Sequence, residues 1–147
     1  MKKKHPSRGS RRFRATGLGY SAAQARSGTS HKLPELEAFP NQYPGYYEIK
    51  IDMPEYTAMC PKTGQPDFGT LTLEYAPNKW VVELKSLKLY LHGFRNVGIF
   101  YENVVNRFLD DVVASVKPRW AKVTGKFTPR GGIASTVTAE FPRRRTR

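Results

Sequence analysis

The sequence is poor in the residues that build disulfides and metal sites. Its 147 residues include a single cysteine, Cys60, and only three histidines, His5, His31 and His92. One cysteine excludes an internal disulfide framework and a zinc site made of several cysteines. So few histidines do not favour a compact histidine-rich metal site either. We therefore expect no metal cofactor.

Long apolar runs are also missing. No stretch approaches the ~20 apolar residues that a membrane-spanning helix needs. The N-terminus is basic, but it lacks the apolar segment of a secretory signal peptide. We therefore expect a soluble, cytoplasmic protein.

Acidic residues are absent from both ends of the chain. Residues 1–30 contain eight Lys and Arg, residues 143–147 contain four Arg, and neither segment has an acid. Most of the net charge of +13 therefore belongs to the ends. We interpret 1–32 as a disordered basic arm, 33–142 as one folded domain and 143–147 as a basic tail. Such tails suit contact with tRNA or another polyanion, but a solvated tail or an organelle-targeting segment has the same composition.

The residues between the tails change their hydrophobic period twice. A period of two predicts strands at 46–53, 70–75, 80–84, 119–127 and 132–140, the first of them ended by Pro54. A period near 3.6 predicts helices at 86–94 and 100–117, the second stopped by Pro118. This order is typical of an α+β domain, with an antiparallel sheet and both helices packed on one face.

Cys60 lies in a turn-rich stretch, residues 60–67, between the first two predicted strands. Proline and glycine break this stretch, so we expect one loop that carries both Cys60 and Asp67. A cysteine attacks as the thiolate, and thiol catalysis usually recruits a neighbouring base. Asp67 is the nearest candidate in the sequence, although His31 or His92 could lie close in space. A lone cysteine is, however, more often a small buried hydrophobe than a nucleophile.

Polar residues also gather where the third predicted strand gives way to the first helix. Lys85 and Lys88 would share one helical face, where two ammonium groups suit a phosphate-bearing ligand. Glu83, just before them, could bind the N–H groups of a purine-like ring, but an ordinary solvated helix face explains the same residues. Arg130, in a glycine-rich turn, is a weaker signal for phosphate. Glu102 opens the second helix, where the dipole favours a carboxylate in any case.

Four motifs, taken together, resemble one known family. They are Cys-Pro-Lys-Thr-Gly-Gln-Pro-Asp-Phe at 60–68, Glu-Leu-Lys-Ser-Leu-Lys-Leu-Tyr at 83–90, Phe-Arg-Asn at 94–96 and Gly-Lys-Phe-Thr-Pro-Arg-Gly-Gly at 125–132. In this order they resemble the short form of QueF, the NADPH-dependent nitrile reductase of queuosine biosynthesis. The resemblance implies the tunnelling fold, shared with GTP cyclohydrolase I, in which antiparallel-sheet subunits assemble into a ring-shaped homo-oligomer.

The resemblance also implies a reaction and assigns residues to it. The nitrile of 7-cyano-7-deazaguanine would be reduced to give 7-aminomethyl-7-deazaguanine, with two NADPH. Cys60 would add to the nitrile carbon as a covalent thioimide, and Asp67 would transfer the proton. Other matched positions would bind the substrate, at Val82, Glu83, Leu84, Tyr101 and Glu102, or the phosphates of NADPH, at Lys85, Lys88 and Arg130. Glu102 would recognise the ring edge through a bidentate contact.

Two positions depart from the family's pattern. Many relatives have histidine where this chain has Tyr101, so the role of an imidazole is lost there or passes to the phenol. Leu84 replaces a serine of some relatives, a change that a backbone contact tolerates.

Two other functions fit parts of the sequence. The archaeal QueF-like amidinotransferases add ammonia to the nitrile on tRNA and share the cysteine and the aspartate, but they lack the full reductase motif present here at 83–90. A non-catalytic RNA-binding protein would explain the basic tails, yet the nearly neutral middle has no aromatic RNA-recognition motif.

Overall fold

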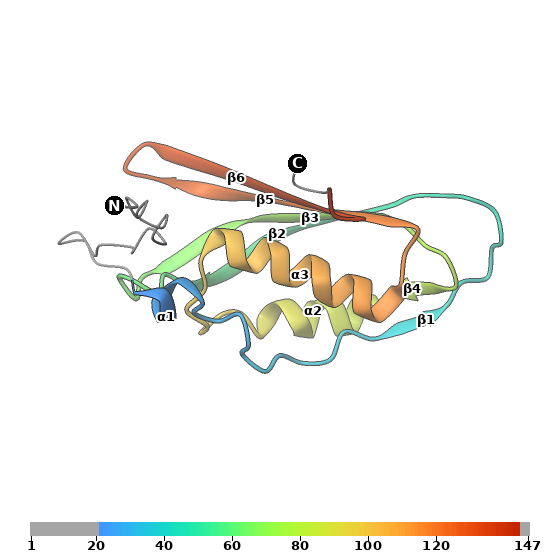
Figure 1. Cartoon of the computed structure of the whole chain (residues 1–147), viewed down its shortest axis with the longest axis horizontal. Helices are drawn as coiled ribbons and strands as arrows, with labels where there is room; N and C mark the ends of the chain where they lie inside the picture. Colours follow the sequence, from blue (N-terminus) through green and yellow to red (C-terminus); the bar gives the residue numbers. More distant parts are fainter. Residues whose placement is uncertain (1–20, 145–147) are drawn as a thin grey trace, which may run out of the picture.

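The computed structural model describes residues 21–144, which form an α+β domain (Figure 1). Its large sheet is antiparallel, with the strand order β2-β3-β5-β6. The strands of this sheet are β2 (Ile49–Met59), β3 (Pro66–Ala76), β5 (Trp120–Arg130) and β6 (Ile133–Phe141). Two short strands, β1 (Ala38–Pro40) and β4 (Trp80–Val82), pair into a separate sheet. The predicted strand at 80–84 therefore exists, but it does not join the large sheet.

Three helices complete the described part of the chain. Helices α2 (Leu84–His92) and α3 (Tyr101–Val116) cover the same face of the large sheet, and the short helix α1 (Ala22–Ala25) lies near one end of it (Figure 1). The order of strands and helices, and the packing of both long helices on one face, confirm the predicted α+β architecture.

Strand β2 continues through Pro54, where the sequence predicted its end. The pairing register shifts between Met53 and Tyr56, where β2 has one residue more than β3 and forms a β-bulge. Pro54 has no N–H to donate, and an edge strand such as β2 tolerates this. Beyond the bulge the buried positions resume at Tyr56 and Ala58. The strand itself, rather than a long loop, therefore leads directly to Cys60.

Capping groups explain where the two long helices begin and end. Glu83 precedes α2, and its carboxylate oxygens accept the N–H groups of Lys85 and Ser86 at 2.8 and 2.6 Å. At the end of α3, Lys117 has a left-handed φ of 45°, and Pro118 follows it. Both predicted helices are confirmed to within about two residues. Within residues 21–144, no helix is both long and apolar enough to cross a membrane.

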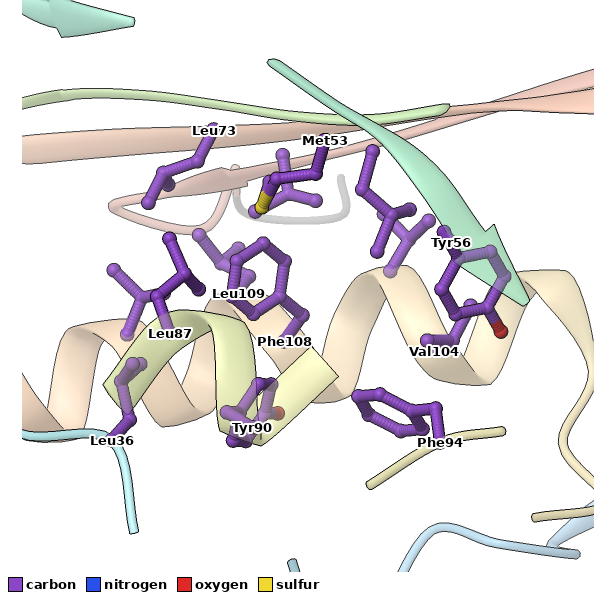
Figure 2. Packing of buried hydrophobic residues seen from close by; sticks show 14 of the residues in the cluster. Leu36, Met53, Tyr56, Leu73, Leu87, Tyr90, Phe94, Val104, Phe108 and Leu109 are labelled. Carbon is purple, nitrogen blue, oxygen red and sulfur yellow. The ribbon is translucent and has the colours of Figure 1, made fainter. Parts of the chain in front are cut away.

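The core lies between the large sheet and the two long helices (Figure 2). Tyr90 is central to it, because its ring centroid lies 5.4 Å from that of Phe94 and 5.6 Å from that of Phe108. Aliphatic side chains from the strands and helices surround these rings, among them Met53, Leu73, Leu87, Val104 and Leu109. This packing fixes the ends of β2 and β3 relative to the start of α3.

The folded part begins earlier than the sequence predicted. The sequence assigns 1–32 to a disordered arm, but within it residues 25–28 contact the domain. Side chains of α3 hold them: Asn103 donates to the carbonyl of Ala25 at 2.6 Å, and Arg107 donates to that of Gly28 at 2.8 Å. Composition did not reveal this packing, because the contacts use backbone carbonyls and a glycine rather than apolar side chains.

The C-terminal tail also begins on the domain. Arg143 pairs with Asp110 of α3 at 2.8 Å, and Arg144 pairs with Glu140 of β6 at 3.2 Å. Residues 1–20 and 145–147 lie outside the described residues, so the disorder and the RNA contact predicted for them stay predictions.

Candidate active site

Cys60 begins a tight turn that joins β2 to β3. Its backbone N–H donates to the carbonyl of Gln65, and its carbonyl accepts the N–H of Gly64, both at 2.8 Å. Gly64 has a φ of 68°, which glycine adopts without strain. The turn spans residues 60–65, shorter than the predicted loop, and holds a half-buried thiol at the end of β2.

The turn also supplies hydrogen-bond donors to the thiol. Burial alone would raise the pKa of the Cys60 thiol, but the Thr63 hydroxyl and the backbone N–H groups of Thr63 and Lys62 outweigh it, so this pKa lies below its ordinary value. A lower pKa increases the share of reactive thiolate at neutral pH. Sequence reasoning looked for a neighbouring base and missed Thr63, whose only signal was its place in the motif.

Asp67 lies in β3, and not in the loop where the sequence placed it. It pairs with Ala58 of β2, and only 8% of its side chain is exposed. Nε of Arg130 in β5 lies 3.2 Å from Oδ1 of this carboxylate, and the hydroxyl of Tyr101 in α3 donates to the same oxygen at 3.3 Å. A buried carboxylate needs such partners, because an unpaired buried charge is costly. The structure thus brings together three predicted residues, Asp67, Tyr101 and Arg130.

The Tyr101 ring is held flat against Phe127 of β5. The ring centroids are 3.8 Å apart and the planes differ by 5°. Burial first, and then the charge of Asp67 and the hydrogen bond to it, raise the pKa of the Tyr101 phenol. The phenol therefore stays protonated at neutral pH and donates to Asp67. The phenol of Tyr101 therefore contacts Asp67, the residue predicted to transfer the proton.

Sequence reasoning missed two further side chains of this cluster. Gln65 accepts a hydrogen bond from Arg130 through its Oε1, at 3.3 Å. The Tyr56 hydroxyl is buried and has no partner in the described part of the chain. Burial, and to a smaller extent the charge of Asp67, raise the pKa of the Tyr56 phenol. Tyr56 could not be found from the pattern because the strand was expected to end at Pro54.

The predicted substrate segment at 82–84 lies away from this cluster. The backbone N–H of Val82 donates to the hydroxyl of Tyr75 at 3.0 Å. Along β3, Tyr75 is about 25 Å from Asp67, at about 3.3 Å per residue. Figure 1 accordingly shows β4 at one end of the large sheet and α1 at the other. A single chain therefore does not bring Val82 to Asp67, whereas Leu84 lines a pocket that also includes Tyr56.

Within that segment, the Glu83 side chain caps the N-terminus of α2. Hydrogen bonds from the N–H groups of Lys85 and Ser86 lower the pKa of the Glu83 carboxyl. The side chain of Val82 is buried, so only its backbone is available to a ligand, whereas Leu84 is 61% exposed.

Glu102 and Lys88 line two separate pockets. Glu102 is exposed at the start of α3 and lines a pocket of about 700 Å³ between α3 and α1. Lys88 lines another pocket, of about 280 Å³, whose lining combines apolar side chains of β2 and α2 with Glu55, His92 and Arg95. Lys85 is exposed on the first turn of α2. Lysine and arginine beside apolar side chains fit a ligand that has both phosphates and aromatic rings.

Comparison with known proteins identifies the family of this chain. A family profile described as "QueF-like protein" matches residues 66–146. An NADPH-dependent 7-cyano-7-deazaguanine reductase of Elusimicrobium minutum is 51% identical over 127 residues, which are 86% of this chain and 96% of that protein. The chain belongs to the QueF family.

Other QueF proteins and a solved structure agree with this assignment. The reductase of the same description from Chloroherpeton thalassium is 60% identical over 110 residues, 74% of this chain and 95% of that protein. The crystal structure of the archaeosine synthase QueF-Like in its apo form matches with a TM-score of 0.58 at 26% identity, covering 67% of this chain and 95% of that chain. The family and the fold predicted from the motifs are thereby confirmed.

Proposed function

We propose that this QueF protein reduces the nitrile of 7-cyano-7-deazaguanine to an aminomethyl group with NADPH. One observation carries the proposal: a thiol with a lowered pKa and a buried, paired carboxylate lie on the facing ends of β2 and β3. Two relatives that bear the name of this activity are 51% and 60% identical to the chain.

The reaction begins at Cys60. The Cys60 thiol passes its proton to the Asp67 carboxylate, and the thiolate adds to the nitrile carbon. As the C–S bond forms, one π pair of the nitrile moves to the nitrogen, which takes that proton back from Asp67. The product is a thioimide, whose C=N bond accepts a hydride more readily than a nitrile. When this bond has been reduced, the C–S bond breaks, and its electron pair returns to Cys60 as the thiolate. The resulting imine is then reduced to the amine.

The partners of Asp67 direct this proton transfer. Tyr101 and Arg130 both contact Oδ1 of this carboxylate. Phe127, stacked on Tyr101, keeps the phenol in this position. The two partners therefore fix the orientation of the carboxylate.

Exposed cations of the chain would hold NADPH. Lys85 and Lys88 on α2 and Arg130 on β5, whose side chain is 42% exposed, are available to its phosphates. When bound, NADPH supplies the two hydrides of the reaction. The pocket beside Lys88 supports this assignment because it combines cations with apolar side chains.

A ring-shaped homo-oligomer would complete the site. Val82 contacts Tyr75, which lies about 25 Å from Asp67 along β3, so a second copy would have to supply this part of the site. Within the chain, the edge strands β2 and β6 each have one unpaired side that a neighbouring copy could extend. Native mass spectrometry of the purified protein tests this part of the proposal, and a monomer that retains full turnover contradicts it.

An NADPH-oxidation assay tests the function. The protein should oxidise NADPH only when 7-cyano-7-deazaguanine is present, and Cys60→Ala should abolish this turnover. Without NADPH, intact-mass analysis should show a gain equal to the substrate mass, lost in Cys60→Ala; the chain has no second cysteine to confuse the assignment. Turnover that survives in Cys60→Ala contradicts the covalent mechanism.

The structural match to an archaeosine synthase supports one alternative. In this reading the chain adds ammonia to the same nitrile carried on tRNA, without NADPH. Incubation of tRNA-bound nitrile with ammonia, beside the free base with NADPH, separates the two activities. Product formed only from the tRNA substrate would favour the alternative.

A further inference from the structure

Residues 21–29, which we call the N-terminal clamp, lie against the end of the domain that carries Cys60. Three polar contacts fix them. The carbonyls of Ala25 and Gly28 accept hydrogen bonds from Asn103 and Arg107 of α3, and the Ser27 hydroxyl donates to the carbonyl of Gly98 at 2.7 Å. The clamp is therefore bound to two segments of the domain.

Gly28 shows how closely the clamp packs against residues 97–99. Its φ of 76° is left-handed, and a Cβ at this position would lie 2.7 Å from both the carbonyl oxygen of Gly98 and the Cβ of Ile99. Only glycine combines this backbone conformation with this contact. The clamp is thus packed against 97–99 at van der Waals distance.

The segment that the clamp contacts is paired in turn with the residue before Cys60. The N–H of Met59 donates to the carbonyl of Val97 at 2.9 Å, and the N–H of Ile99 donates to the carbonyl of Met59 at 3.1 Å. One strand-like segment therefore separates the clamp from the backbone that carries the thiol.

The clamp also lines the pocket that contains Glu102. Ala22, Ala25 and Arg26 line one side of this pocket, and Phe100, Glu102 and Asn103 line the other. Its volume of about 700 Å³ lies within the range of ligand pockets. Ala22 and Ala25 contribute short apolar side chains to this lining, and the carboxylate of Glu102 can accept the N–H groups of a heteroaromatic ring.

We propose that the N-terminal clamp is the second wall of the substrate pocket, and that its alanine face at Ala22 and Ala25 stacks on the deazaguanine ring whose edge Glu102 binds. This inference rests on the proposed function. It makes Ala22 and Ala25 specificity-determining residues for a planar base, although they lie in a stretch whose composition indicates only a basic arm.

Two neighbouring alanines allow a matched test. Ala22 lines the pocket, whereas Ala23 is exposed on the same helix and does not line it. Ala22→Phe should raise the KM for 7-cyano-7-deazaguanine about tenfold or more, with the KM for NADPH and the unfolding midpoint unchanged. Ala23→Phe should leave all three unchanged. Equal KM values for the base in the two variants would overturn the proposal.

Hydrogen exchange of the unmodified protein gives a second test that needs no substitution. Formation of the adduct with 7-cyano-7-deazaguanine should protect the amides of residues 22–26, and unchanged exchange there would overturn the proposal. The unmodified protein also distinguishes a failure of the proposed function from a failure of the clamp proposal. If it does not oxidise NADPH with the base, the proposed function fails; if it does and both clamp tests are negative, only the clamp proposal fails.

Discussion

Two carboxylates at opposite ends of the large sheet, Asp67 and Glu83, differ in the groups that bind them. Asp67 is buried at the end that carries Cys60, and its partners, Tyr101 and Arg130, come from other elements of the fold. Glu83 lies at the other end, and its partners are the N–H groups of the two residues that open the next helix. The sequence assigned them different roles, proton transfer to Asp67 and substrate contact to Glu83, but it did not show what holds either carboxylate in place.

The difference lies in what each carboxylate does for the chain. A helix N-cap satisfies local backbone groups and would be useful in any protein with a helix at this place. A carboxylate buried between strands has no local benefit, and it needs a cation and a hydroxyl from far away in the sequence to be tolerated. Asp67 is therefore the stronger candidate for catalysis within one chain, and Glu83 combines a structural role with the substrate contact proposed for an oligomer.

The largest expected effect is at Asp67. Asp67→Asn keeps the shape of the side chain but removes the transferable proton, so turnover should fall at least about 100-fold. The Cys60 adduct should still form, more slowly, in the absence of NADPH. Intact-mass analysis and NADPH oxidation measure the two steps separately.

Asp52→Asn is a matched control for this change. Asp52 lies on the neighbouring strand β2, is exposed, and also accepts a hydrogen bond, from the Thr72 hydroxyl at 2.7 Å. We expect it to behave like the unmodified protein. If both variants lose the same share of activity, Asp67 has no special role and the comparison with Glu83 fails.

A smaller effect is expected at Thr63. Thr63→Val removes a donor to the Cys60 thiol, so the pKa of that thiol should rise. Because the thiolate forms above this pKa, the rise of the alkylation rate with pH should move to higher pH, and the rate at neutral pH should fall about tenfold. Iodoacetamide labelling over a pH series measures this at the single cysteine. Thr63→Ser keeps a hydroxyl and should retain the original profile; an unmoved profile in Thr63→Val speaks against activation by the turn.

The smallest effect is expected at Glu83. Two substitutions there separate its role as a helix cap from its proposed role in substrate binding. Glu83→Ala removes the helix cap and should shift the unfolding equilibrium roughly fivefold towards the unfolded state. Glu83→Ser restores a capping oxygen and should recover most of this loss, while any contribution of the carboxylate to substrate binding stays lost. Urea unfolding at equal protein concentration and the KM for the base measure the two effects. An alanine variant as stable as the parent would show that the cap contributes nothing.

The sequence anticipated most of the elements but not their limits. Periodicity located both long helices, because each has an apolar stripe along its buried face. The sequence pattern placed the end of β2 at Pro54, because the rule that proline ends a strand does not account for a β-bulge on an edge strand. It assigned the clamp to a disordered arm, because neither a glycine nor a backbone carbonyl carries a signal of packing.

By itself, the sequence determined the chemistry available to this protein: one thiol, its motif, the family to which the motif belongs, and the placing of positive charge at the two ends. Only the tertiary structure decided which of these groups meet. Asp67 and Tyr101 are 34 residues apart in the sequence and are joined because the register of β3 and the packing of α3 bring them together. Contacts of this range depend on the whole core, and no local pattern records them.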